Sequence, residues 1–125
     1  LWLRRGQWAG EQVLSPQRVA EALAPSQPMN RAYGLLFWLN GQAPAIDAMG
    51  GKWPSTMAPF APADLFAAHG FGNQFVDVIP SLDLVVVRFG KDPTSGGLDL
   101  AALAVDAKFA RHDRILAPVL RAAQP

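Results

Sequence analysis

The sequence predicts an α+β domain in which an antiparallel sheet of about three strands is flanked by N-terminal and C-terminal helices. Two apolar, strand-like runs, residues 73–79 and 84–89, are joined by a four-residue turn, and strands joined so closely must be antiparallel. A Ser-Pro helix start precedes them, and a helix-spaced apolar pattern follows them. With 125 residues the chain forms one domain at most, and it is long enough to bury a core.

The bulk composition excludes several classes of function. The formal net charge is +1 and lysine and arginine form no block, so electrostatics give no case for a nucleic-acid partner. No apolar run reaches the length that crosses a bilayer, so we expect no membrane span. Cysteine is absent, which excludes disulfides and cysteine-based metal or nucleophile chemistry.

In the N-terminal part, residues 1–5 predict the last turns of a helix that Gly6 stops. Ser15 and Pro16 predict the start of a second helix, because a hydroxyl caps its first turn and proline suits its first position. We expect this helix to end before Pro25.

The chain opens on Leu1 inside an apolar, helix-like pattern, without an initiator methionine or a signal-peptide pattern. We therefore expect the later part of a longer polypeptide. The compartment stays open between periplasmic or secreted and cytoplasmic, because any signal region would lie upstream.

Two segments fill the middle of the chain. Residues 33–40 are rich in aromatic and aliphatic side chains and predict a strand buried on both faces. Residues 41–62 are rich in proline and glycine, and they predict a long connection of the kind that is usually functional or mobile.

In the C-terminal part, the alternation of residues 73–79 places three side chains on one face of a strand: Phe75, Asp77 and Ile79. The continuous apolar run at 84–89 predicts a central strand that is covered on both sides. A helix is expected from Leu98 onward, interrupted by the charged residues 111–114, with a short final helix over 115–122.

The two histidines lie far apart in the sequence. His69 stands at the entrance to a glycine segment, and His112 lies in the charged linker, where we expect solvated surface. No carboxylate cluster accompanies either histidine, so no metal site is predicted. For Asp77 the sequence leaves two alternatives open, a solvated position on an open face or a paired one.

Gly70 and Gly72 allow two interpretations. They mark a β-bulge or an unusual strand entry, which by itself is the commoner case. Alternatively, they leave a backbone N–H pointing at a ligand oxygen. The segment lacks a third glycine and precedes a strand, so it does not match a dinucleotide-binding loop.

The chain by itself carries no complete catalytic apparatus. No serine is followed three residues later by lysine, and the single tyrosine, Tyr33, is followed by glycine and leucine. A serine nucleophile needs such an activating partner.

Three stretches together carry a resemblance to a known family. Residues 3–16 read Leu-Arg-Arg-Gly-Gln-Trp-Ala-Gly-Glu-Gln-Val-Leu-Ser-Pro, and residues 33–38 read Tyr-Gly-Leu-Leu-Phe-Trp. Residues 70–87 read Gly-Phe-Gly-Asn-Gln-Phe-Val-Asp-Val-Ile-Pro-Ser-Leu-Asp-Leu-Val-Val-Val. In this order they resemble the helix–turn–helix, the Tyr-Gly-hydrophobic-Trp strand and the final hairpin of the β-lactamase-related serine hydrolases, the superfamily of class C β-lactamases and esterase-like enzymes.

The resemblance implies a partial β-lactamase/transpeptidase-like fold, with residues 1–125 as the C-terminal portion of a single domain. The Ser-x-x-Lys nucleophile and the tyrosine motif of the family would lie upstream. The third motif, ideally Lys-Thr-Gly on the strand beside the pocket, falls on Ala68, His69 and Gly70. Lysine is replaced by Ala68 and threonine by His69, which fits the esterase or amide-hydrolase branches better than a true β-lactamase.

The resemblance also implies the site. The backbone N–H of Phe71 matches the second oxyanion-hole donor, and one preorganised donor stabilises the transition state by roughly 3 kcal/mol. Substrate-contacting positions would be Ala68, His69, Gly70 and Gly72. Residues 41–62 would form a pocket wall, and no cofactor is implied.

The function implied is a serine hydrolase that acts on a small-molecule ester or amide through an acyl-enzyme. The alternative from another class is a non-catalytic α+β module that pairs with a partner through an open strand edge. An exposed edge also predicts self-association of the isolated chain.

Overall fold

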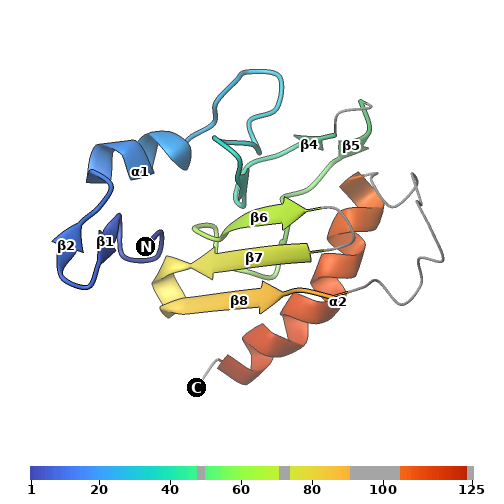
Figure 1. The fold of residues 1–125 in the computed structure, drawn as a ribbon. Coiled ribbons are helices and arrows are strands. Elements are labelled where there is room, and N and C mark those ends of the chain that lie inside the picture. The colour runs from blue at the N-terminus through green and yellow to red at the C-terminus, as the bar shows by residue number, and fades with distance from the viewer. Residues whose placement is uncertain (48–49, 71–73, 91–104, 124–125) are drawn as a thin grey trace.

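The computed structural model describes residues 1–47, 50–70, 74–90 and 105–123. Its centre is a four-stranded antiparallel sheet in the order β3-β6-β7-β8, and helix α2 crosses one face of this sheet (Figure 1). The bounds of these elements are as follows: β3, Trp38–Leu39; β6, Phe66–Gly70; β7, Gln74–Ile79; β8, Leu84–Arg88; α2, Val105–Ala123. The predicted α+β class is confirmed.

The register of the sheet decides which side chains share a face. Ala67 of β6 pairs with Asp77 of β7, which in turn pairs with Val86 of β8. Because side chains alternate along a strand, these three positions point to the same side, toward α2. The predicted grouping of Phe75, Asp77 and Ile79 on one face of β7 follows from the same register, and all three are buried.

The larger core lies between the sheet and α2. Its fully buried members include Ile79 from β7 and Phe109 and Leu116 from α2. The ring of Phe109 meets Trp38 of β3 edge-to-face, with ring centroids 5.2 Å apart. Aromatic pairs of this geometry add stability beyond the area that they bury.

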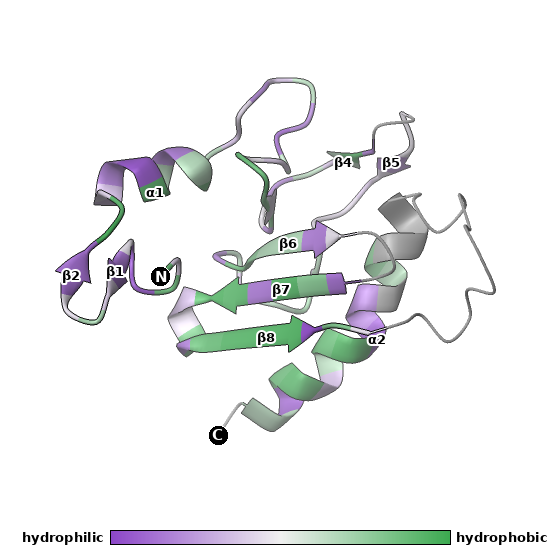
Figure 2. Ribbon diagram, viewed as in Figure 1, coloured by the Kyte–Doolittle hydropathy of each residue, from purple (hydrophilic) through white to green (hydrophobic). Residues whose placement is uncertain are grey.

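The opposite face of the sheet is covered only in part. A hairpin of β1 (Gln7–Trp8) and β2 (Glu11–Gln12) lies beside the turn between β7 and β8 (Figure 1). Helix α1 (Pro16–Ala22) and the first residues of the chain lie next to β3 and β6. A small core of buried side chains forms there: Leu39, Phe66 and Val78. On β8, by contrast, Val85 and Val87 are 44% and 52% exposed, and the strand is apolar along most of its length (Figure 2).

Helix α1 begins as predicted. Ser15 Oγ accepts a hydrogen bond from the Arg18 N–H at 3.3 Å, and Pro16 occupies the first helical position. The helix ends against Gly34, where an added Cβ would lie 2.4 Å from the carbonyl oxygen of Ala22. Only glycine fits this close approach.

The long connection contains more structure than predicted. Strand β4 (Ala45–Ile46) pairs with β5 (Lys52–Trp53). Asn40 anchors the following segment, because its side-chain amide donates to the carbonyl oxygens of Ala58 and Pro62 at 3.0 Å and accepts from the Ala58 N–H at 2.9 Å.

Two N-terminal predictions are wrong. Residues 1–5 form turns instead of the end of a helix, because Arg5 and Gly6 both adopt positive φ and the Gly6 N–H bonds back to Leu1 O at 3.0 Å. In the predicted strand at 33–40, only Trp38–Leu39 is a strand.

The apolar run at 33–40 is interrupted because the backbone reverses direction within it. Leu36 has a φ of +70° and is 79% exposed, and Tyr33 forms a bridge with Trp38 across the turn.

Two C-terminal predictions are also wrong. The strand β8 is the last in the described part of the sheet, so it is not central, and its valines alternate between half-buried and exposed. The charged residues 111–114 do not break the helix, since α2 runs continuously from Val105 to Ala123 and carries Arg114 on its exposed side. The predicted start at Leu98 lies outside the described residues.

Within the described ranges, neither helix is both long and apolar enough to cross a membrane.

Candidate functional site

A buried His–Asp–His cluster, made of His69, Asp77 and His112, lies between the sheet and α2. The three side chains are 2%, 0% and 0% exposed. The Nε2 atom of His112 lies 2.9 Å and 3.0 Å from the two carboxylate oxygens of Asp77, and His69 Nε2 lies 3.9 Å from Asp77 Oδ1. The two imidazole rings are neighbours, with centroids 4.7 Å apart.

Three separate elements bring this cluster together. His69 pairs with Phe75, and Ala67 pairs with Asp77, so His69 and Asp77 are diagonal neighbours on the α2 face of the sheet. His112 reaches them from α2, where it lies three residues after Phe109 and four before Leu116. That spacing places His112 on the buried side of the helix.

The surroundings of the cluster are apolar on two sides. Phe75 lies edge-on to His112 at a centroid distance of 5.0 Å, and Phe109 lies 6.0 Å from His69. One further carboxylate is close, since Asp113 Oδ1 lies 3.6 Å from Nδ1 of His112. The two ring nitrogens of His112 therefore face two different carboxylates.

Burial and pairing act in opposite directions on the charges of the cluster. Burial alone would raise the pKa of Asp77, but hydrogen bonds and positive charge from His112 and His69 outweigh it and lower that pKa. Burial alone would lower the pKa of His112, but Asp113 and Asp77 reverse the effect and raise the pKa of His112 to about 9. At neutral pH, Asp77 is therefore ionised and His112 protonated.

The prediction that His112 lies on solvated surface is wrong, and of the two alternatives for Asp77 the structure shows the paired one. His112 is buried instead of solvated, and Asp77 is paired. Sequence reasoning missed the cluster because it treated residues 111–114 as a linker. The helical spacing of Phe109, His112 and Leu116 was the signal that could have found it.

The predicted pocket-edge residues lie on β6 and divide between its two faces. Ala68 and Gly70 share the face of Phe66, opposite α2, whereas the His69 side chain points into the buried cluster. Strand β3 pairs only with Phe66 and Ala67, so its ladder ends before Ala68. Phe71 and Gly72 lie outside the described residues.

Gly70 differs from the structurally required glycines of this chain. It sits in regular β-pairing with Gln74, without a positive φ. A Cβ added to Gly70 would meet only ordinary contacts, the nearest being Gln74 Cβ at 3.6 Å. The bulge interpretation therefore does not apply to Gly70.

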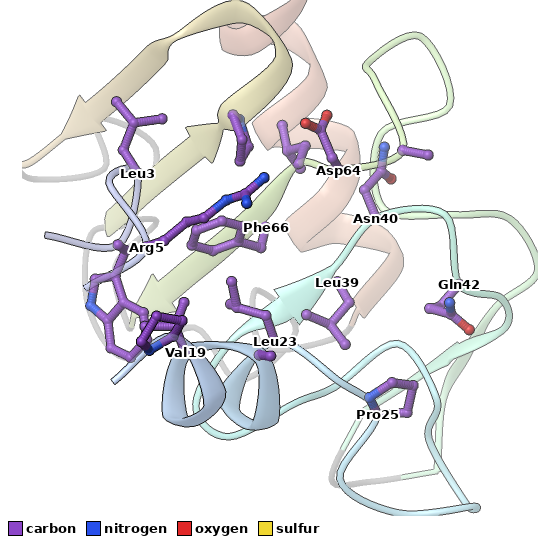
Figure 3. Close-up of a pocket in the computed structure, with 16 residues that line it drawn as sticks. Leu3, Arg5, Val19, Leu23, Pro25, Leu39, Asn40, Gln42, Asp64 and Phe66 are labelled. Atoms are coloured by element: carbon purple, nitrogen blue, oxygen red, sulfur yellow. The ribbon is translucent and has the colours of Figure 1, made fainter. Parts of the chain in front are cut away.

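A groove opens on the same face of the sheet, at the Phe66 end of β6. It encloses about 580 Å³, a size typical of small-molecule sites. Figure 3 shows Val19 of α1 and Leu23, the residue after that helix, along one side and Leu39 and Phe66 of the sheet along another. Polar side chains join the lining: Arg5, Asn40, Gln42 and Asp64.

Two of these polar side chains are held in place by the fold. Asn40 anchors the loop as described above, and Asp64 accepts hydrogen bonds from the backbone N–H and the hydroxyl of Ser81 at 2.7 Å and 2.9 Å. The groove therefore combines apolar walls with fixed polar groups, the usual composition of a small-molecule site.

Comparisons with models of protein families, with curated proteins and with solved structures gave no match to this chain.

Proposed function

We propose that this chain supplies the pocket-edge strand of a serine hydrolase that cleaves an ester or an amide through an acyl-enzyme. In that reaction a serine Oγ attacks the acyl carbonyl, the C–O or C–N bond to the leaving group breaks, and water then releases the acid. The 125 residues contain no Ser-x-x-Lys pair, so the serine and its lysine would come from polypeptide that precedes Leu1.

Gly70 is the observation that carries this proposal. Gly70 is the last residue of β6, and among the described residues neither its φ nor a close contact requires glycine there. A glycine that the described structure does not require fits a place where another group approaches the backbone closely. In the proposal that group is the acyl part of the substrate, next to the N–H of Phe71.

Ala68 supports a neutral substrate. Its side chain lies on the same face as Gly70, at the position where the family has a lysine. Without that cation the pocket edge has no anchor for a substrate carboxylate, so neutral esters and amides are favoured.

The test is to read the DNA upstream of the codon for Leu1 and to express the whole reading frame. We expect an in-frame Ser-x-x-Lys, hydrolysis of a nitrophenyl ester by the intact product, and loss of this activity when that serine is changed to alanine. An upstream sequence without an open reading frame, or without this motif, would rule the proposal out.

A second candidate is an assembly module, favoured by strand β8. It is the last strand of the described sheet, and Val85, Val87 and Phe89 are exposed on or beside it. An added strand from a partner would pair with such an edge. The test uses the full-length protein. If it lacks esterase activity but forms a defined complex, and if Val87→Lys disrupts that complex, this candidate is favoured over the hydrolase.

A further inference from the structure

We propose that the His–Asp–His cluster is a binding site for one divalent transition-metal ion, of which Zn²⁺ is the best probe, with His69, Asp77 and His112 as its protein ligands. The site would tie β6, β7 and α2 together. This inference goes beyond the hydrolase proposal and is independent of it, since the cluster lies on the other side of the sheet from Ala68 and Gly70.

The donor geometry fits a small ion. One ligand atom from each of the three residues lies within 4.8 Å of the other two. Zinc bonds of about 2.1 Å place the corners of a tetrahedron about 3.4 Å apart. The observed separations from Asp77, 2.9 Å to His112 and 3.9 Å to His69, fall on either side of that value. Both separations from Asp77 need a change of about half an ångström, and the ligand atoms of the two imidazoles, within 4.8 Å of each other, need to approach by up to about 1.4 Å.

The charges also favour an ion over a simple ion pair. A salt bridge between Asp77 and His112 would need only one imidazole, yet His69 is equally buried and converges on the same carboxylate oxygen. The two imidazole rings are neighbours, with centroids 4.7 Å apart, so one ion can contact both. A divalent cation lets both rings remain neutral ligands and takes the carboxylate as its third ligand.

The surroundings are those of a metal-ligating histidine. With Nε2 of His112 on the metal, the ring proton sits on Nδ1, which faces Asp113 Oδ1 at 3.6 Å. A carboxylate behind a ligating imidazole orients the ring and raises its basicity. Phe75 and Phe109 supply an apolar shell around the ligands. Three protein ligands leave the fourth position of a tetrahedral ion to a water molecule.

The direct test uses the unmodified chain without a polyhistidine tag. Zn²⁺ is titrated into the ¹⁵N-labelled protein while the imidazole resonances are followed by NMR. The chain has two histidines, so both sets of signals are assignable and both should shift together and saturate at one equivalent. Calorimetry should give one ion per chain, and the melting temperature should rise with added Zn²⁺.

Variants assign the ligands. Removing a ligand in His69→Gln or Asp77→Asn should weaken Zn²⁺ binding by about 100-fold or more, and Asp113→Asn, which alters a positioning residue, by about 10-fold. Asp83→Asn is the matched control, because this exposed carboxylate pairs with Arg4 at the surface and should leave the affinity unchanged.

The proposal is overturned if neither imidazole responds to a tenfold excess of Zn²⁺, or if His69→Gln binds Zn²⁺ as tightly as the unmodified chain. Should a variant fail to fold, as judged by circular dichroism, the titration of the unmodified chain decides the question on its own.

Discussion

The two faces of the central sheet are built in opposite ways. On the α2 face, apolar side chains are closed over by a long helix, and the polar groups among them, His69, Asp77 and His112, are fully enclosed. On the other face, the cover is limited to the β3 and β6 side, a groove remains open, and β8 exposes its valines. The first face is therefore closed by packing, whereas the second leaves a groove and apolar side chains accessible.

A related contrast holds on the second face, between two glycines. Gly34 is required by contact with the end of α1, while Gly70, on the open face, is required by nothing that the described residues contain. A glycine on the open face that the described structure does not require is a candidate functional position. Each prediction below breaks or sharpens this division.

The largest effect is expected from Asp77→Asn in metal-free protein. The substitution leaves the buried imidazole of His112 without its carboxylate partner, and breaking a buried ion pair costs about 3–5 kcal/mol. Urea unfolding followed by circular dichroism measures it. Asp83→Asn, at the exposed pair with Arg4, should cost less than about 1 kcal/mol. Equal losses at both positions would mean that burial of the Asp77–His112 pair does not determine its contribution.

A second comparison uses apolar residues on opposite faces. Leu116→Ala on α2 should lower the free energy of unfolding by about 2–5 kcal/mol, because the side chain is fully buried and a cavity remains. Val87→Thr on the open side of β8 should change it by less than about 0.5 kcal/mol, since this residue is half exposed. A large loss at Val87 would mean that another surface covers β8.

The glycine pair sharpens the comparison further. Gly34→Ala should destabilise the protein by about 1–3 kcal/mol, because the new Cβ would lie 2.4 Å from the Ala22 carbonyl oxygen and the backbone must move. Gly70→Ala should leave the free energy of unfolding unchanged or raise it by about 0.5–1 kcal/mol. Thermal melts of the two variants side by side give the answer.

The smallest effect is a pH dependence of metal-free protein. Folding raises the pKa of His112 from 6.5 to about 9, so its contribution is fully present below pH 6.5 and is lost as the pH rises through about 9. We expect a loss of about 1–2 kcal/mol between pH 6.5 and 8.5.

The contribution of Asp77 to stability changes at acidic pH. Its pKa is lowered by folding, so its contribution is present above its ordinary pKa of 3.8 and is lost as the pH falls below that value. Urea midpoints across the pH range test both directions. A profile that stays unchanged in His112→Gln would contradict the role of His112.

Local chemistry made part of this fold predictable. Ser15 and Pro16 marked the start of α1, and the alternation around Asp77 placed its side chains on the correct faces. The tight turn before β8 predicted the antiparallel hairpin. These features depend on a few neighbouring residues, which is why the sequence alone reveals them.

The errors have a common origin in tertiary contacts. The run at 33–40 was predicted to be one strand, but Gly34 packs against the end of α1 and Leu36 adopts a positive φ. The valines of β8 read as central, although no described strand follows β8 in the sheet.

The candidate sites differ in the same way. Ala68 and Gly70 were singled out from the sequence and share one face of β6, but the partnership of His69 with His112 depends on how α2 crosses the sheet. Residues far apart in the sequence meet only through that packing.

The most direct measurement is the esterase activity of the whole reading frame carrying Gly70→Val, compared with its thermal stability. The account predicts an unchanged or higher melting temperature together with a loss of kcat/KM of about 100-fold, because a side chain on the open face would displace the substrate carbonyl from the strand edge. Full activity in this variant would contradict it, since Gly70 would then have no part in approaching a substrate.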